Sequence, residues 1–431
     1  MRTATTSPTP TPTLDPSPTP TPTAAGGHRS PWLAFSVVAV GTFMATLDGN
    51  IVNVALPTIG RELAAPVARL QWIVSGYVLA ITATLLVLGR LGDRLGHRAV
   101  YAGGLVVFTL GSALCGLAPG LGALVGARVL QAVGASAMMA IGPAVVTAAF
   151  PPTMRGRALG AVGTVVAVGL TAGPPLGGLI VAALSWRWVF YVNLPIGLAG
   201  AAWALRTLPR GGGAPGGPLL DLSLFRIPVF TYGLIAGLLS YAAMFCQTLL
   251  TPFLLARVLG LPPATLGVVL VSVPVALSIA SPLSGWISDR FGGRRLPFAG
   301  MIVLAAALVL LSLAGADDSV GSIAARLALA GLGMGLFQSP NNAAVMSALP
   351  RERLGSGGGL LATARNGGMA AGIGIAGAIV ALRAGPDAAN GGFLAGYATS
   401  LRAGAVLALV AGAVSLFPRS RSSRVPFPLD P

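Results

Sequence analysis

The chain has 431 residues, of which 54% are hydrophobic and only 9% are charged, and its mean hydropathy is +0.82. Soluble domains carry roughly 25% charged residues, so a soluble fold of this size could not cover its surface with so few charges. The composition therefore indicates a polytopic membrane protein. All 27 basic residues are Arg, and the lack of Lys excludes a phosphate-binding loop of the G-x-x-x-x-G-K type and Schiff-base chemistry.

The formal net charge of +16 could suggest a nucleic-acid partner. Arg residues at the cytoplasmic edges of membrane spans explain the same charge, so we expect no nucleic-acid binding. Cys115 and Cys246 both lie in apolar runs, and the only His residues are His28 and His97. These four side chains predict neither a disulfide framework nor a metal site.

Residues 1–31 are rich in Thr and Pro, which predicts a disordered cytoplasmic tail. Apolar runs then recur with short breaks. We expect membrane-spanning helices at 32–56, 70–90, 99–119, 121–148, 156–184 and 187–206 and, after a Gly- and Pro-rich connector at 207–227, at 228–252, 263–287, 296–315, 319–348, 355–382 and 394–417. The prediction is an all-α membrane protein with twelve helices in two six-helix bundles, 32–206 and 228–418, and a cytoplasmic tail at 419–431.

The positions of the Arg residues indicate the orientation of these helices. With the N-terminus in the cytoplasm, eighteen Arg fall on the cytoplasmic side, six on the outer side and three within spans. This asymmetry satisfies the positive-inside rule. We therefore expect a multi-pass protein of the bacterial inner membrane with both termini in the cytoplasm.

The two halves repeat one charged motif. Gly89-x-x-x-Asp93-Arg94-x-Gly96 follows the second predicted span, and residues 285–292, which include Asp289 and Arg290, repeat it 196 residues later. Arg98 completes the first copy. Parallel repeats of this kind place the substrate path between the halves, near the bilayer midplane.

Three further segments carry a family resemblance, namely Leu47-Asp48-x-x-Ile51-Val52-Asn53-Val54-Ala55-Leu56-Pro57, Gly169-x-x-x-Gly173-Pro174-x-x-Gly177-Gly178 and Trp186-Arg187-Trp188-x-Phe190-x-x-Asn193-x-Pro195. With the 89–98 loop, they resemble the major facilitator superfamily and, within it, the usually fourteen-helix drug:proton antiporters of the EmrB/QacA type. The resemblance covers roughly residues 32–420.

This resemblance implies an alternating-access transporter. It assigns a conformational switch loop to Gly89, Asp93, Arg94, Gly96 and Arg98, repeated at Asp289 and Arg290, and an antiporter motif to Gly169, Gly173, Pro174, Gly177 and Gly178. The connector at 207–227 is too short for two additional spans, which need roughly 40 residues, so we predict a twelve-helix member. Asn50 is a further departure, since the family more often has Thr there.

Asp48 is the only acidic residue within any predicted span. A charge at the centre of a span costs roughly 2.5–3.5 kcal/mol on insertion scales, so a function is the first interpretation and a structural ion pair the alternative. Asp48 and Arg128 lie at similar depths, ~12 Å and ~10 Å from the outer ends of their helices at 1.5 Å per residue. We predict that this pair couples transport to protons.

Neutral polar side chains share the first helix with Asp48. Thr42, Thr46, Asn50 and Asn53 form a stripe opposite Asp48 on an ideal helix. Two explanations remain open: the helix breaks at Gly49, or one face meets the fourth span and the other meets the substrate.

Candidate substrate contacts are the polar groups in the spans, namely Asn50, Asn53, Gln131, Gln247, Gln338, Asn341, Asn342 and Arg365. Arg365 lies ~16 Å into its helix without an acidic partner in the spans of its half. Hydrogen bonding of Arg365 to backbone carbonyls is the alternative to substrate contact.

The leading interpretation is proton-coupled export of an amphipathic small molecule, such as an antibiotic, by a monomer. It uses the proton gradient and needs no cofactor or metal. The alternatives are export of a native metabolite, such as a sugar or an amino acid, and a transport-inactive sensor on the same fold. No H-E-x-x-H or G-x-S-x-G motif supports a membrane enzyme.

Overall fold

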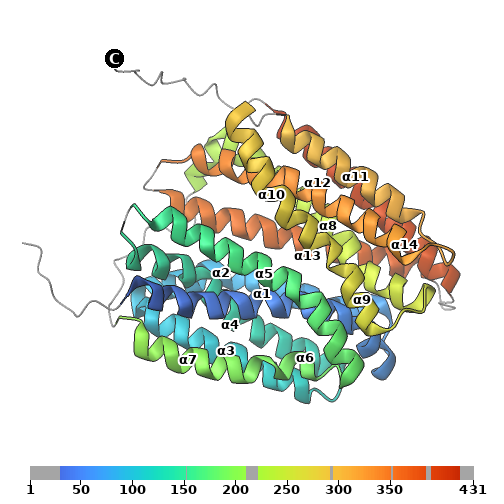
Figure 1. Cartoon of the computed structure of the whole chain (residues 1–431), viewed down its shortest axis with the longest axis horizontal. Coiled ribbons are helices and arrows are strands. Elements are labelled where there is room, and N and C mark those ends of the chain that lie inside the picture. Colours follow the sequence, from blue (N-terminus) through green and yellow to red (C-terminus); the bar gives the residue numbers. More distant parts are fainter. Residues whose placement is uncertain are drawn as a thin grey trace, which may run out of the picture.

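The computed structural model describes residues 30–151, 153–209, 222–291, 295–350, 353–384 and 390–417, and all regular structure in these ranges is helical (Figure 1). The first half contains α1 (Pro31–Glu62), α2 (Val67–Leu95), α3 (His97–Leu117), α4 (Leu121–Ala149), α5 (Arg155–Ala183), α6 (Trp188–Tyr191) and α7 (Asn193–Thr207). The second half contains η1 (Leu222–Arg226), α8 (Pro228–Phe253), η2 (Leu254–Val258), α9 (Pro263–Leu270), α10 (Ser272–Phe291), α11 (Leu296–Ser312), α12 (Val320–Ser347), α13 (Leu354–Ala384) and α14 (Asn390–Ser415).

Within the described residues, these helices provide eleven segments of membrane length and one shorter apolar helix, α11. The short helix α6 forms one span with α7, η2 extends α8, and α9 forms one span with α10. The predicted twelve-helix membrane fold is therefore confirmed. Most of the predicted tails and connector lie outside the described residues.

The predicted ends of two helices were wrong at prolines. The first span was expected to end at 56, but α1 continues to Glu62 with Pro57 inside it. The seventh was expected to end at 252, but α8 and η2 continue to Val258, past Pro252. A proline removes one backbone donor from a helix, whereas ending the helix inside the bilayer would leave several backbone groups without partners.

The helices form two bundles, α1–α7 and α8–α14, whose close contacts repeat between the halves (Figure 1). In the first bundle, a Cβ added to Gly134 of α4 would lie 2.5 Å from the carbonyl oxygen of Gly104 of α3. In the second bundle, a Cβ added to Gly300 of α11 would lie 2.6 Å from the carbonyl oxygen of Gly333 of α12. Small residues let membrane helices pack backbone to backbone. The close packing of α3 on α4 is therefore repeated by that of α11 on α12.

The two bundles join mainly through α2 with α13 and α5 with α9. We call the end that carries the α2–α3 junction at Gly96 the loop end, and the end that carries the α1–α2 junction, residues 63–66, the seam end. At the seam end, Ile51 of α1 and Leu266 of α9 belong to one continuous apolar cluster. Toward the loop end, the cluster around Tyr101 includes only Ala370 and the partly buried Met369 from the second bundle, and the cluster around Phe230 lies within the second bundle. The buried apolar contact between the bundles is thus most extensive toward the seam end.

Candidate functional site

The predicted switch loop forms the tight junction between α2 and α3. Gly96 has a φ of +91°, a conformation that favours glycine. The His97 Nε2 lies 3.6 Å from Asp93 Oδ1, and the Arg98 guanidinium donates a hydrogen bond to the carbonyl of Leu205 in α7.

The remaining switch-loop residues lie around this junction. A Cβ added to Gly89 would meet only Ala140 of α4, at 3.8 Å, and Arg94 is exposed. In the repeat, the Arg290 guanidinium lies 5.6 Å from the centre of the Trp286 ring, and the side chain of Asp289 lies outside the described part of the chain. The first copy of the loop therefore ties α2, α3 and α7 together.

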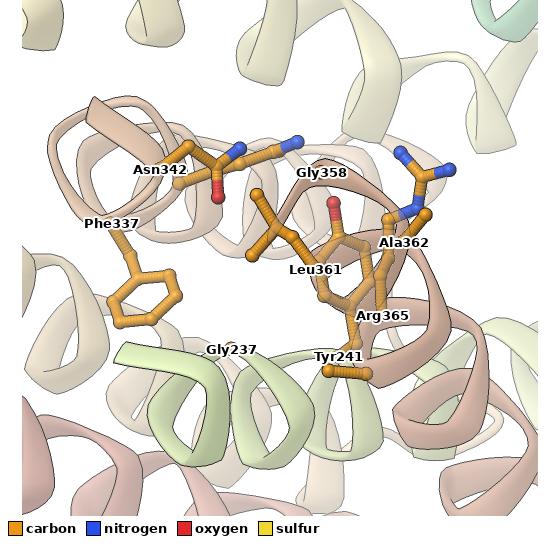
Figure 2. A pocket seen from close by; sticks show the side chains of 10 residues that line it. Gly237, Tyr241, Phe337, Asn342, Gly358, Leu361, Ala362 and Arg365 are labelled. Carbon is orange, nitrogen blue, oxygen red and sulfur yellow. The ribbon is translucent and has the colours of Figure 1, made fainter. Parts of the chain in front are cut away.

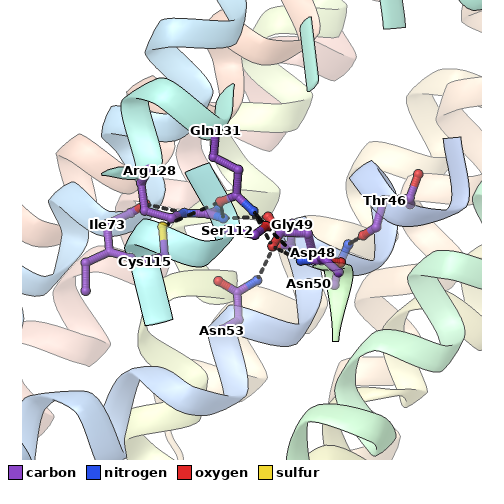
Figure 3. A network of polar contacts seen from close by, with 11 residues as sticks. Thr46, Asp48, Gly49, Asn50, Asn53, Ile73, Ser112, Cys115, Arg128 and Gln131 are labelled. Atoms are coloured by element: carbon purple, nitrogen blue, oxygen red, sulfur yellow. Dashed lines mark hydrogen bonds and ion pairs between the residues drawn. The ribbon is translucent and has the colours of Figure 1, made fainter. Parts of the chain in front are cut away.

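Asp48 and Arg128 form an ion pair inside the first bundle, with Arg128 Nη1 donating to Asp48 Oδ2 at 2.5 Å (Figure 3). The other carboxylate oxygen, Oδ1, accepts hydrogen bonds from Gln131 Nε2 at 2.9 Å and Asn193 Nδ2 at 3.0 Å. The same two amides also donate to the hydroxyl of Ser112. Helices α1, α3, α4 and α7 each contribute a side chain, so one network connects four helices.

Arg128 has a second set of partners. Its Nη1 also donates to Gln131 Oε1 at 2.6 Å, and its Nε donates to the carbonyl of Ile73 at 3.3 Å. Its guanidinium carbon lies 3.9 Å from the centre of the Tyr77 ring. Asp48 is 0% exposed and Arg128 is 1% exposed. Removing such charges from water is costly, and the pair needs this many partners to persist.

The structure excludes a break in the first helix. Helix α1 runs unbroken through Gly49, so Asp48 faces α4 and the Asn50 stripe faces the other way. On that stripe the side chains bond their own helix: Thr46 to the carbonyl of Thr42, Asn50 to that of Thr46 and Asn53 to that of Gly49.

The predicted antiporter motif of α5 divides into two contact surfaces. Gly169, Gly173 and Gly177 face α1, where added Cβ atoms would press on Thr46, Asn50 and Ile51. Gly178 faces α9 of the other bundle, and its Cβ would overlap the carbonyl oxygen of Pro263. A Cβ added to Gly267 of α9 would likewise overlap the carbonyl oxygen of Pro174. Helix α5 therefore packs on α1 with one face and closes the seam end with another.

The predicted substrate contacts also separate into two groups. Gln131 belongs to the Asp48 network, Gln247 bonds Thr248 and Thr251, and Asn341 donates to the carbonyl of Gly233. These side chains and that of Asn53 are buried. Gln338, Asn342 and Arg365 instead line a pocket in the second bundle (Figure 2).

The sequence model of the Major Facilitator Superfamily matches residues 38–373. The chain belongs to the Major Facilitator Superfamily. It is 32% identical over 390 residues to the riboflavin transporter RibZ of Clostridioides difficile. The alignment covers 78% of this chain and 86% of that protein. It is 31% identical over 412 residues to the multidrug resistance protein Stp of Mycobacterium tuberculosis. This alignment covers 82% of this chain and 76% of that protein.

A solved structure shows the same fold. A bacterial homologue of the human lysosomal transporter Spinster, crystallised in an inward-facing and unoccupied conformation, matches 91% of this chain and 97% of its own with a TM-score of 0.75. At 17% identity this likeness concerns the fold alone. The predicted family is thus confirmed, and this facilitator-superfamily member is a transporter and not an enzyme.

Ser112, Asn193 and Tyr77 complete the Asp48 network of this transporter, and none of them was predicted to belong to it. Asn193 belongs to the 186–195 motif, and this position could have marked it as a functional residue. No sequence feature distinguishes Ser112 or Tyr77 from residues that only pack in the core. Gln131 was expected to touch substrate. Its spacing of three from Arg128 places both on one face of α4, and this spacing could have indicated its observed role.

Replacing Asp93 with Asn is expected to slow transport severely and leave substrate affinity nearly unchanged, because Asp93 lies at the loop end, beside His97. Equilibrium binding and transport rate measured on the same purified protein separate the two effects. Asp318→Asn is the matched control, since it removes another partly exposed carboxylate, one that pairs with Arg326 at 2.8 Å. Loss of binding in the Asp93 variant would contradict a purely conformational role.

Proposed function

We propose that this transporter exports amphipathic small molecules, including antibiotics, in exchange for protons across the bacterial inner membrane. The observation that carries the proposal is the Asp48–Arg128 pair, a titratable group sealed inside the membrane-spanning part of the first bundle. Buried ionisable residues in membrane spans are costly and characteristic of proton relays in transporters. The similarity to the multidrug resistance protein Stp supports this class of cargo.

Helix α1 gives a physical route for coupling. One of its faces holds Asp48 against Arg128 of α4, and the other packs on the glycine stripe of α5. Helix α5 also closes the seam end against α9. Opening this seam would move α5, and α1 with it, relative to α4. A carboxylate that loses its three donors in a dry interior is stabilised by taking up a proton, so seam opening and proton uptake are linked.

We propose that the loop end faces the cytoplasm, as the Arg distribution predicts, and that the described conformation is closed on the outer side. Reporter fusions after Phe417 should then read as cytoplasmic, because twelve spans return the chain to the side where it began. An alkaline phosphatase fusion at the same site should be inactive. A periplasmic signal there would overturn the orientation.

The proposed activity can be tested in two steps. A bacterial host that lacks its own exporters should become less susceptible to some members of an antibiotic panel when it produces this protein. With the compound that shows the largest change, proteoliposomes should show compound movement in one direction and proton movement in the other, measured with a pH dye in the lumen. Compound movement without proton movement would contradict antiport and leave a uniporter.

A native metabolite is the second candidate cargo. The similarity to a riboflavin transporter, which covers 86% of that protein, favours it. The same proteoliposomes distinguish the two kinds of cargo. If riboflavin competes with transport of the test compound, a metabolite is favoured as cargo; if only antibiotics compete, a drug is favoured.

A further inference from the structure

The pocket in the second bundle is formed by α8, α12 and α13 (Figure 2). Its volume is about 110 Å³, and its polar lining residues are Tyr241, Gln338, Asn342 and Arg365. Gly237 and Gly358 also line it, and Cβ atoms added there would meet the nearest side chains only at 3.7 Å and 4.0 Å. The two glycines thus leave open the space in front of the polar groups.

Arg365 is the charged group of this pocket. Arg365 takes part in none of the ion pairs found between residues of the described part of the chain. Its Nε is buried and has no hydrogen-bond partner in the described part of the chain. Tyr241 interacts with both Arg365 and Gln338, and Figure 2 shows Tyr241 and Arg365 on the same side of the pocket. The guanidinium therefore has the Tyr241 hydroxyl as a neighbour, and the same hydroxyl meets the amide of Gln338.

Among the described residues, the positive charge of this pocket has no counter-ion. Within the described ranges, the ten lining residues include no Asp or Glu. Asp48, which lies inside the first bundle, is 0% exposed and already bonded to Arg128, Gln131 and Asn193. A cation in a membrane interior is costly when unpaired, and a guanidinium fits the two oxygens of a carboxylate through parallel hydrogen bonds.

We propose that this pocket binds an acidic group of the cargo, a carboxylate or a phenolate, with Arg365 as its counter-ion and Tyr241 and Gln338 as supporting hydrogen-bond partners. The proposal rests on the proposed function only in treating the occupant as cargo. Arg365 lies ~16 Å along α13 at 1.5 Å per residue, deep in the span and far from the level of lipid headgroups. This depth favours a soluble acid over a lipid phosphate.

Three fluorescent probes with the same apolar body test the charge preference: 1-pyrenebutanoic acid, 1-pyrenebutanol and 1-pyrenebutyl trimethylammonium. Binding to the purified full-length transporter in detergent, without a proton gradient, should be strongest for the acid. Arg365→Gln should weaken binding of the acid at least about tenfold, since hydrogen bonds to charged groups are stronger than those between neutral groups. The alcohol should bind the variant as it binds the original protein.

Two further variants separate recognition from folding. Arg365→Lys keeps the charge but not the paired donors, so it should retain part of the preference for the acid. Gly358→Leu should fill the pocket and weaken binding of all three probes. A phosphatidylglycerol titration that displaces the acid would identify a lipid headgroup as the occupant and overturn the assignment to a soluble cargo.

Three results would overturn the acidic site. They are equal binding of the three probes, no measurable binding of the acid, and an Arg365→Gln variant that weakens all probes alike, as expected if Arg365 only supports the helix packing. Because no gradient is applied, a failure of proton coupling would leave these binding results intact. Loss of the preference for the acid would likewise leave antiport of other cargo untouched.

Discussion

Replacing Asp48 with Asn is expected to abolish proton-driven export, lowering it to the level of protein-free liposomes. The Asn side chain can still accept hydrogen bonds from Gln131 and Asn193, but it cannot bind and release a proton. Arg128 keeps its bonds to Gln131 and the carbonyl of Ile73 and its contact with Tyr77, so the bundle should still fold. Efflux driven by an imposed pH gradient, at matched protein amounts, measures the effect.

A charge-neutral double variant separates coupling from stability. Removing one partner of a buried ion pair typically costs ~3–5 kcal/mol, whereas removing both charges is often far less destabilising. Thermal unfolding of Asp48→Asn and of Arg128→Gln should therefore occur at lower temperature, and the double variant should recover much of the loss. If the pair were only structural, export would recover together with stability. The proposed role predicts recovered stability without export.

The Asp48–Arg128 contact could be predicted because both residues are charged in otherwise apolar helices. Charge is rare in a membrane span, and equal depth in two helices is a strong restriction on which groups can meet. The remaining members of the network are small or neutral. Ser112 and Asn193 have many counterparts along the chain, and only the packing of α3 and α7 against α1 selects them.

The antiporter motif shows a different limit of sequence analysis. A spacing of four predicts that Gly169, Gly173 and Gly177 share one helix face, and they do. The spacing does not say which helix that face meets, nor that Gly178, one residue further, meets the other bundle. The twelve helices in two halves were predictable from the apolar runs and the repeated loop, and the family from the resemblance of its motifs. Which helix each face contacts depends on tertiary packing.

Replacing Gly178 with Leu is expected to prevent closure of the seam end and to abolish transport. The added side chain would overlap the carbonyl oxygen of Pro263 and press on Ala264 Cα at 3.2 Å. Both are backbone atoms, so rotation of a neighbouring side chain cannot relieve the overlap. Overpacking typically costs 1–3 kcal/mol, or about 5- to 150-fold in the population of the closed state. Gly126→Leu is the matched control, since nothing lies within 4 Å of a Cβ there.

Spin labels at positions 61 and 257 can measure this closure directly. Arg61 lies in the last turn of α1 in one bundle and Arg257 lies in η2 of the other, close enough for their charges to interact. Cys115 and Cys246 are buried, so introduced cysteines are the accessible labelling sites in the described part of the chain. The distance should lengthen in Gly178→Leu and stay as it is in Gly126→Leu. If Gly178→Leu left both the distance and transport unchanged, the α5–α9 contact would not be the seam that alternates, and α5 could not transmit its opening to the Asp48 network.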